Sequence, residues 1–423
     1  MSGLKISIFT PTNRAPSKFF DEAWAGILEQ TYPNWEWLIV ENNGGKVPEH
    51  ISSHPNVRVV TFDKETPEGE PNSIGALKRF GALHCSGDVL VELDDDDILT
   101  PDACQVLAET YTDNNVQTAY SNCVEFRSDT WESRVFGARW GWQSRPYNYK
   151  GREMQQCVAW PPGPWNLRYI CWSPNHLRSW RKSAYIHLGG HDPLLELVDD
   201  HDLNIRAYLA FGAKGVRHID EALYMYRLHG DSNCQKYLKK IQASDKDCYR
   251  KYVVALAERW SFDNHLLTID LGGAFNPKPG YMTVDKKNAQ IETDLNERWP
   301  FADNSVGIIR AMHVVEHLKD PVHVMNEMYR VLAPGGWAFI EVPSTDGRGA
   351  FQDPTHVSYW NENSFWYYTR EDKAKFVPEI KARFQVSRLS TYKWTKDEIP
   401  VTQAHLIALK PGYEERRAGE ILI

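Results

Sequence analysis

Four consecutive aspartates, Asp94–Asp97, are the residues of this chain most suited to chemistry. An apolar strand pattern over 88–93 leads directly into them and an apolar pair at 98–99 follows, so at least two carboxylates must be held together near a buried edge. A divalent cation would offset their repulsion, and Mg²⁺ or Mn²⁺ prefers such oxygen ligands when it carries a nucleotide diphosphate. A solvated charged face is the alternative, and the apolar flanks argue against it.

The patterns before the aspartates predict the elements that position them. Strands are expected over 6–10 and 37–40, with a helix over 17–30 between them, which is a βαβ beginning. The helix carries one apolar face, formed by Phe20, Ala23, Trp24 and Ile27. The aspartates then stand at the carboxyl end of a strand in an open α/β sheet, the edge at which such sheets bind ligands.

Length and composition limit the class of protein. The chain has 423 residues, enough for two or three hydrophobic cores, and its 42% hydrophobic and 25% charged residues are typical of globular proteins. No segment approaches the roughly 18 consecutive apolar residues of a membrane span, so we expect a cytoplasmic protein. The seven cysteines include no C-x-x-C pair, which predicts neither a disulfide framework nor a zinc knuckle. The net charge of −8 argues weakly against nucleic acid as a partner.

A second α/β pattern fills the C-terminal part of the chain. A helical pattern without Pro or Gly runs over 236–260 and precedes it. Strands are then expected over 266–271, 281–284, 307–311 and 337–342, with a helix ending at Leu332. This order predicts a second nucleotide-binding-like sheet.

Four motifs in the N-terminal half resemble those of the family 2 glycosyltransferases, which have a GT-A fold, use nucleotide-sugar donors and invert the anomeric centre. In chain order they are I-F-T-P-T-N-R over 8–14, Q-T-Y-P-N-W-E over 30–36, L-D-D-D-D-I-L over 93–99, and L-G-G over 188–190 with D-D-H-D-L over 199–203. The resemblance covers roughly residues 4–235.

The resemblance implies roles for individual residues. Asp200 corresponds to the general base, Asp96 to a metal ligand, and Asp94 to a contact with metal or ribose. His229, in Y-R-L-H-G-D-S over 226–232, matches a position near the metal and the diphosphate. An inverting transfer is a single displacement, so it needs one base and electrostatic help for the departing diphosphate. The implied donor-binding residues are Thr10, Pro11, Glu41, Arg79 and Asp94.

The chain departs from the family pattern after its second strand. Glu41, Asn42 and Asn43 stand where the family usually has two aspartates that contact the base and the ribose. Glu41 is still able to accept a hydrogen bond from a ribose hydroxyl or a base N–H. The uridine preference common in the family is therefore not carried over, and the donor base and sugar stay open.

Residues 131–180 form a tryptophan-rich segment between the motifs. The segment contains seven Trp, and its seven Arg or Lys against two Glu give a net charge of +5. In a GT-A enzyme the corresponding stretch shapes the acceptor side, and aromatic faces with arginines suit sugars, phosphates or exposed bases. Many of these side chains are equally compatible with a core or an interface. The acceptor candidates are Trp140, Trp142, Trp160 and Trp165.

The C-terminal half resembles the S-adenosylmethionine-dependent methyltransferase fold over roughly residues 264–410. The resemblance rests on L-T-I-D-L-G-G over 267–273, D-L over 294–295, W-P-F-A-D-N-S over 299–305, H-V-V-E-H-L over 313–318 and L-A-P-G-G over 332–336. The motif Q-D-P-T-H over 352–356 also matches this group, without an evident role. The implied cofactor-binding residues are Asp270, Gly272, Gly273 and Asp285.

Two departures weaken the case for S-adenosylmethionine binding. Ala274 replaces the second glycine of the turn, and only nine residues separate the first two strands, too few for the helix whose N-terminus normally faces the cofactor. An active methyltransferase and a degenerate or scaffolding domain therefore both stay open.

We predict an α/β chain with an N-terminal GT-A nucleotide-sugar-binding sheet and a C-terminal Rossmann-like methyltransferase sheet with a shortened first crossover. The expected domains are residues 1–235 and 263–423, joined by a helical connector over 236–262.

The predicted function is metal-dependent, inverting transfer of a hexosyl-type sugar from a nucleotide-diphosphate donor to an acceptor hydroxyl on a carbohydrate or other, possibly anionic, molecule. The expected cofactors are Mn²⁺ or Mg²⁺, with S-adenosylmethionine if the C-terminal domain methylates the product rather than holding the acceptor. The alternatives are transfer to modified nucleic acid and a non-catalytic scaffold with degenerate sites.

Overall fold

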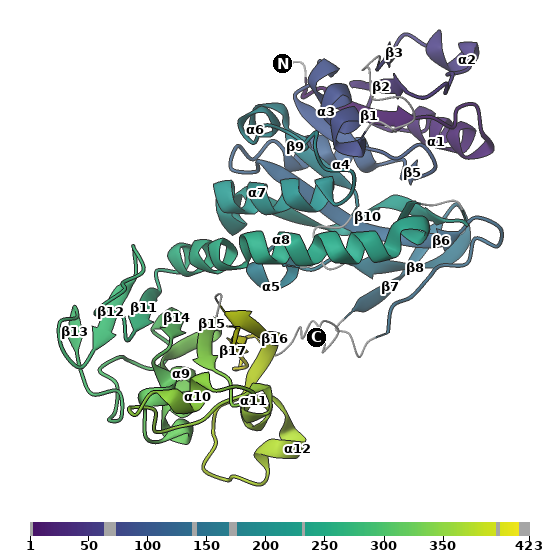
Figure 1. The fold of residues 1–423 in the computed structure, drawn as a ribbon. Helices are drawn as coiled ribbons and strands as arrows, with labels where there is room; N and C mark the ends of the chain where they lie inside the picture. Colours follow the sequence, from purple (N-terminus) through teal and green to yellow (C-terminus); the bar gives the residue numbers. More distant parts are fainter. Residues whose placement is uncertain are drawn as a thin grey trace. The chain divides into compact units, whose positions relative to one another are not determined.

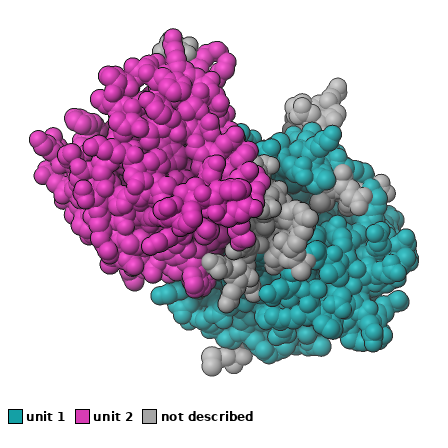
Figure 2. Space-filling view, turned by 90° about the horizontal axis from the view of Figure 1, so that it is seen from below, with its two compact units in different colours: residues 1–138, 142–256 teal, residues 139–141, 257–423 magenta. Residues whose placement is uncertain are grey.

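The computed structural model describes residues 3–62, 73–137, 142–168, 176–230, 233–394 and 398–413, with only the backbone described for 233–235. The chain forms two compact units, which Figure 2 shows in different colours. Unit 1 ends at Leu256, and unit 2 continues from Ala257. Both units are α/β, as the sequence predicts.

Unit 1 is built on a sheet that has ten strands in the described residues, in the order β3-β2-β1-β4-β9-β6-β10-β5, with β8 pairing with β6 and β7. Parallel strands make up its first half (Figure 1): β1 (Ile6–Thr12), β2 (Trp35–Glu41), β3 (Val57–Thr61) and β4 (Val89–Glu92). β1, β2 and β4 are almost entirely buried, as strands covered on both faces must be. The remaining strands are β5 (Ile98–Leu99), β6 (Thr118–Arg127), β7 (Gln143–Tyr149), β8 (Arg152–Val158), β9 (Arg178–Arg181) and β10 (Val216–Leu228).

The helix α1 (Lys18–Leu28) shows how the predicted apolar face is used. The Ser17 side chain accepts a hydrogen bond from the Phe20 N–H and caps the helix N-terminus. Phe20 and Trp24 then stack on Trp37 of β2, with ring centroids 5.3 and 5.7 Å apart. The other helices of unit 1 are α2 (Glu49–Ser52), α3 (Ile74–His84), α4 (Ala103–Thr110), α5 (Pro164–Leu167), α6 (Lys182–His187) and α7 (Asp199–Gly215).

The long helix α8 (Asn233–Asp263) contains the whole range predicted for the connector. It runs beside α7 and α5 (Figure 1), and Tyr252 and Leu256 lie in one apolar cluster with Tyr208 of α7. The Tyr252 hydroxyl also donates a 2.5 Å hydrogen bond to Asp202. The part of α8 up to Leu256 therefore belongs to unit 1 and contributes Tyr252 and Leu256 to its core. Among the described helices, α8 included, none combines the length and the apolar character that crossing a bilayer requires.

Unit 2 has a sheet of seven strands in its described residues, in the order β13-β12-β11-β14-β15-β17-β16. The strands from β13 to β15 are parallel, and β17 is antiparallel to β15 and β16. The strands are β11 (Leu267–Leu271), β12 (Met282–Asp285), β13 (Ile291–Glu292), β14 (Val306–Met312), β15 (Leu332–Pro343), β16 (Phe384–Trp394) and β17 (Ile399–Ala408). The helical elements are η2 (Val315–His317), α9 (Pro321–Val331), α10 (Gly349–Gln352), α11 (Glu362–Thr369) and α12 (Glu371–Ala374).

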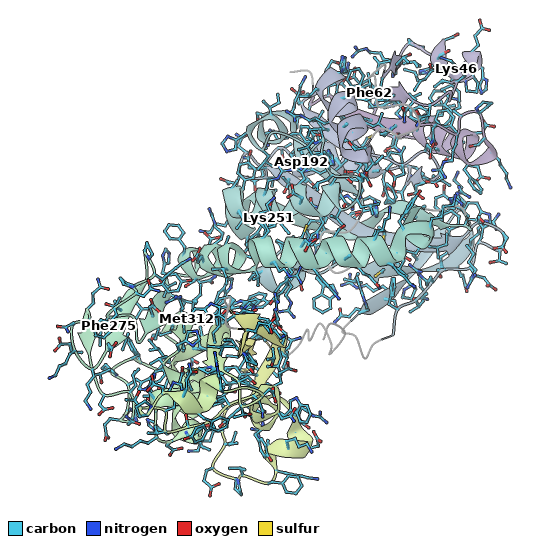
Figure 3. All side chains as sticks on the ribbon, in the orientation of Figure 1. Lys46, Phe62, Asp192, Lys251, Phe275 and Met312 are labelled. Atoms are coloured by element: carbon cyan, nitrogen blue, oxygen red, sulfur yellow. The ribbon has the colours of Figure 1, made fainter. Side chains whose placement is uncertain are left out.

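The crossover between β11 and β12 is shortened, as predicted. Residues 272–281, all of them described, form turns and contain no helix. Gly272 has a φ of +71°, a left-handed conformation that glycine adopts easily, and a Cβ at this position would lie 2.8 Å from the Val314 side chain. Phe275 stands in the same turn and is 92% exposed (Figure 3).

The buried His405 on β17 gives unit 2 a predictable pH dependence. Its ring is 7% exposed and lies edge-on to Phe339, and burial together with the charge of Arg388 lowers its pKa from 6.5 to about 3. As the pH falls, His405 is protonated in the unfolded chain before it is protonated in the folded one. Stability is therefore lost between pH 6.5 and about 3 and is independent of this group above 6.5.

We expect the unfolding free energy of the wild type, compared with His405→Gln in denaturant titrations, to fall by about 1.4 kcal/mol per pH unit in that window. A difference that stays constant from pH 8 to pH 5 would contradict the assignment.

Candidate active site

The carboxyl ends of β1, β2 and β4 meet at one edge of the unit 1 sheet because these strands are parallel neighbours. Thr12 and Glu41, the last residues of β1 and β2, pair with each other in the register. Asp94–Asp97 follow β4 at the same edge, as the sequence predicts.

The four aspartates divide into two inward-facing and two partly exposed side chains. Asp95 and Asp97 are 5% and 1% exposed, and burial raises the pKa of both. Asp95 accepts a 2.7 Å hydrogen bond from the Thr12 hydroxyl and pairs with Arg14. Asp97 accepts hydrogen bonds from the Tyr224 hydroxyl at 2.9 Å and from a backbone N–H of β10 at 2.6 Å. These two carboxylates therefore hold the turn in place.

Asp94 and Asp96 are half-buried and keep part of their surface exposed. The Asp96 Oδ2 atom lies 2.7 Å from His229 Nε2 and 2.8 Å from Arg14 Nη2. Burial raises the pKa of Asp96, but the His229 hydrogen bond and the Arg14 charge outweigh it and leave this pKa lowered. For Asp94, burial raises the pKa to about 7, against the opposing charge of Lys78. The structure thus brings His229 to Asp96 of the D-x-D motif, where Arg14 supplies a positive charge.

A buried charge network connects this edge to α7. Glu92 on β4 is 1% exposed, and its Oε1 atom lies 2.8 Å from Lys78 Nζ and 3.0 Å from Arg178 Nη2. Arg178 Nη1 in turn lies 2.8 Å from Asp200 Oδ2. Lys78 Nζ also lies 3.6 Å from Asp199 Oδ2. Strands β4 and β9 and helices α3 and α7 therefore share one set of ion pairs.

Asp200 is the one acid of the D-D-H-D segment, all of it described, that keeps exposed surface. Asp199 is 3% exposed beside Lys78, and Asp202 is 2% exposed and accepts from Arg206 and Tyr252. Burial raises the pKa of Asp200, but the charges of Arg178 and Lys78 outweigh it and lower this pKa to about 2. Asp200 is therefore an ionised carboxylate at the first turn of α7, with a fixed orientation.

Sequence reasoning missed several members of the network: Lys78, Glu92, Arg178 and His191. His191 has no exposed surface, its Nδ1 atom shares a 2.7 Å hydrogen bond with the Tyr185 hydroxyl, and its Nε2 atom lies 3.4 Å from Glu92 Oε2. Arg79 was the basic residue expected on this helix, yet it is half-buried and has no ion pair with any residue that the structure describes. The sequence signal that indicates this network is Glu92, a carboxylate inside an otherwise apolar strand.

The expected donor-binding residues differ in their availability. Thr10 has no exposed surface, and its hydroxyl accepts a 2.8 Å hydrogen bond from Trp37 Nε1, so its side chain faces the interior. Pro11 is half-buried. Both oxygens of Glu41 are engaged at 2.9 Å, one by Lys46 and one by the Val47 N–H.

In unit 2 the predicted cofactor residues lie at the carboxyl ends of β11 and β12. Asp270 has no exposed surface, and it is bound by Arg310 Nη1 at 2.7 and 2.9 Å and by the Lys278 N–H at 2.9 Å. Gly272 and Gly273 form the turn that follows, and Asp285 is half-buried at the end of β12. Asp270 therefore stabilises the turn after β11 from its buried side, whereas the carboxylate of Asp285 is partly exposed to solvent.

Two families match separate parts of the chain. Residues 7–162 match "Glycosyl transferase family 2", and residues 251–340 match "Methyltransferase domain". The chain contains a family 2 glycosyl transferase domain and a methyltransferase domain. Asp94, Asp96 and the first strands lie inside the first match, and the turn after β11 lies inside the second.

Two curated relatives match over somewhat more than half of this chain. EpsH of Bacillus subtilis (strain 168), whose name describes it as a glycosyltransferase, is 24% identical over 247 residues, 58% of this chain and 67% of EpsH. Chondroitin synthase of Escherichia coli is 23% identical over 239 residues, 55% of this chain and 30% of the synthase. Among solved structures, S. aureus TarS 1–349 in complex with UDP matches with a TM-score of 0.39 and 14% identity, over 65% of this chain and 76% of that one.

The tryptophan-rich segment of the glycosyl transferase unit is mostly internal where it is described. Trp142 and Trp160 are 8% and 2% exposed and meet edge-to-face, with ring centroids 6.1 Å apart. Trp165 is half-buried, beside Gly163 at the start of α5. Trp140 lies outside the described residues. Trp165 is therefore the described candidate with the most surface for an acceptor.

Removing Lys78 is expected to destabilise the glycosyl transferase unit strongly. Lys78→Met leaves Glu92 with Arg178 and His191 but removes its closest cation, and breaking a buried pair typically costs about 3–5 kcal/mol. We expect a loss near the lower end, about 3 kcal/mol, in urea unfolding. The matched control is Arg79→Met at the next helix position, for which a small effect is expected. Equal effects of the two substitutions would contradict the network.

Proposed function

We propose that unit 1 is a metal-dependent, inverting glycosyltransferase that moves a sugar from a nucleotide-diphosphate donor to an acceptor hydroxyl. The observation that carries the proposal is the pairing of an ionised Asp200, whose side chain is 16% exposed, with Arg178, within the network that also contains Lys78. The charges of Arg178 and Lys78 also act on Asp94. The expected base, Asp200, and the expected donor-binding carboxylate, Asp94, therefore interact with the same two cations. The family match and the curated relatives support the same class of reaction.

Asp200 is assigned the role of general base. As the acceptor oxygen bonds to the anomeric carbon, the hydroxyl proton passes to Asp200, and the bond between that carbon and the diphosphate breaks. Arg178 keeps the carboxylate unprotonated and oriented before the reaction. A single displacement of this kind inverts the anomeric centre and needs no covalent enzyme intermediate.

Asp94, Asp96 and His229 are assigned to the diphosphate side of the site. Two carboxylates and an imidazole suit Mn²⁺, and the oxygen ligands also suit Mg²⁺. Such an ion, when bound, supplies positive charge to the departing diphosphate. Arg14 now pairs with Asp96, so it is expected to move to the phosphates or release this carboxylate when the ion binds. The raised pKa of Asp94 fits a group that is ionised fully only beside a cation.

For unit 2 we propose one of two roles: methylating the product with S-adenosylmethionine, or holding the acceptor. Asp285 is the expected partner of the ribose hydroxyls, because Asp270 is engaged by Arg310. The acceptor is expected to be a carbohydrate or another hydroxyl-bearing molecule. Transfer to modified nucleic acid is the less favoured alternative, since the described tryptophans of the basic segment are largely internal.

The test is thermal unfolding of the full chain against UDP, GDP, CDP, ADP and TDP, each with and without Mn²⁺, and separately against S-adenosylmethionine. A ligand that binds only the folded chain adds about 2.7 kcal/mol of stability at 100 times its Kd. We expect one diphosphate to stabilise the chain in a metal-dependent way, and its sugar nucleotide to be hydrolysed slowly without acceptor. If no diphosphate stabilises the chain, the scaffold alternative holds.

A further inference from the structure

Two sequence motifs without an assigned role meet at the carboxyl edge of the unit 2 sheet. H-V-V-E-H-L follows β14 and Q-D-P-T-H follows β15, and these strands are parallel neighbours. The backbone oxygen of Glu316 accepts hydrogen bonds from the N–H groups of Val357 and Ser358 at 2.9 and 3.0 Å. The Ser358 hydroxyl also donates to the Val315 oxygen at 3.0 Å. The two motifs are therefore fixed to each other by main-chain contacts.

The Glu316 carboxylate is buried there without a hydrogen-bond donor. The residue is 2% exposed, and neither carboxylate oxygen has a hydrogen-bond partner among the described residues. Two imidazole nitrogen atoms lie close to its Oε1 atom: His313 Nδ1 at 3.7 Å and His356 Nε2 at 4.0 Å. A buried carboxylate without a partner is strongly unfavourable, so this position calls for a positive charge.

Two imidazoles beside Glu316 are held in the tautomer that binds a metal. His356 Nδ1 lies 2.9 Å from the Ala350 oxygen, and His317 Nδ1 lies 3.2 Å from the Thr355 oxygen. A carbonyl oxygen only accepts, so each Nδ1 carries the proton and each Nε2 keeps a free lone pair. Metal-ligating histidines are oriented in this way by backbone carbonyls.

We propose that Glu316, His317 and His356 form a binding site for a divalent transition-metal ion, with Zn²⁺ as the expected ion. One ligand atom from each of the three lies within 4.8 Å of the others, close enough to share an ion. Two imidazoles and one carboxylate suit Zn²⁺ and leave a fourth position open for water or an oxygen ligand. The site lies wholly in unit 2, and it does not depend on the transfer reaction proposed for unit 1.

Asp353 adds an acid on the exposed side of this site. Its Oδ1 atom is occupied by the Thr355 N–H at 2.8 Å and hydroxyl at 2.6 Å, whereas its Oδ2 atom lies 4.0 Å from His356 Nε2. Asp353 therefore holds the loop that carries His356 and places negative charge beside the ion. A metal at this edge would face the region where parallel α/β sheets bind their ligands.

The test uses the full chain, stripped of metal with a chelator and titrated with Zn²⁺ by calorimetry and with Co²⁺ by absorption. We expect one ion per chain at this site, with the affinity reduced more than about 100-fold in Glu316→Gln and in His356→Ala. If Glu316→Gln and His356→Ala fold poorly, His317→Ala, at a half-buried position, should show the same loss of affinity. Zn²⁺ should raise the unfolding temperature of the wild type and leave that of the ligand variants unchanged.

Two controls separate this site from other histidines. His50→Ala removes an exposed imidazole on α2 and should bind the ion as the wild type does. His229→Ala should also retain it, because His229 belongs to the site of unit 1. A wild type that binds no Zn²⁺, or equal binding by the wild type and all three ligand variants, would overturn the proposal. Loss of the ion in His229→Ala alone would assign it to unit 1 and would overturn it as well.

Discussion

Asp200→Asn is expected to leave donor binding intact and to lower turnover by about 10²–10⁴-fold, the usual contribution of a positioned base. The amide keeps the shape of the carboxylate but is unable to accept the acceptor's proton. Arg178 keeps its 3.0 Å contact with Glu92 in this variant, so the network that holds β4, β9 and α7 together should survive. The measurement is release of nucleoside diphosphate from the sugar nucleotide, alongside its stabilisation of the folded chain.

Asp202→Asn is the matched control for this experiment. Asp202 lies two positions further along α7, but it is buried and engaged by Arg206 and Tyr252. Its substitution should lower stability without removing the transfer step in the chain that remains folded. Near-normal turnover in Asp200→Asn would show that the base lies elsewhere, and Asp199 would be the next residue to test.

Asp96→Ala is expected to abolish the metal-dependent part of nucleotide binding. The substitution removes the carboxylate that contacts both His229 and Arg14, and with it the expected ligand of the ion. At a nucleotide concentration of 100 Kd, the loss amounts to about 2.7 kcal/mol of stabilisation. The residual shift in unfolding temperature should be the same with and without Mn²⁺, because the expected metal ligand is gone and Arg14, released from Asp96 but still beside Asp95, is the cation left for the phosphates.

Asp95→Asn tests whether the effect is specific to Asp96. Asp95 also pairs with Arg14, but it is 5% exposed and accepts from the Thr12 hydroxyl inside the sheet edge. We expect this variant to be less stable and still to bind nucleotide in a metal-dependent way. An unchanged Mn²⁺ effect in Asp96→Ala would remove the basis for the assignment of this site.

Much of the fold follows from local sequence patterns. The apolar stripe on α1 and the strand before the aspartates are visible in the sequence because both depend on residue spacing within one element. The short crossover after β11 is equally readable, since nine residues with two prolines leave no room for a helix. These features are fixed by neighbours along the chain.

Contacts between distant segments explain what the sequence did not predict. Lys78 and Arg79 are adjacent basic residues, and only the packing of α3 decides that Lys78 faces Glu92. Thr10 lies in a motif associated with the donor, yet its hydroxyl is taken by Trp37 from the neighbouring strand. Glu316 and His356 are 40 positions apart, and their proximity depends on the parallel pairing of β14 and β15.

The course of α8 also bears on how the two halves of this protein can be separated or exchanged. Tyr252 and Leu256 are needed by unit 1, whereas the Ser261 hydroxyl already donates to the Leu266 oxygen in unit 2. Only residues 257–260, about one helical turn, lie between the last of these unit 1 residues, Leu256, and Ser261 of unit 2. A fragment or a chimera therefore has no loop at which to be cut. Its junction has to fall within that turn and keep the helical register. Each unit has its own fold, but the position at which the two can be joined is restricted to this turn.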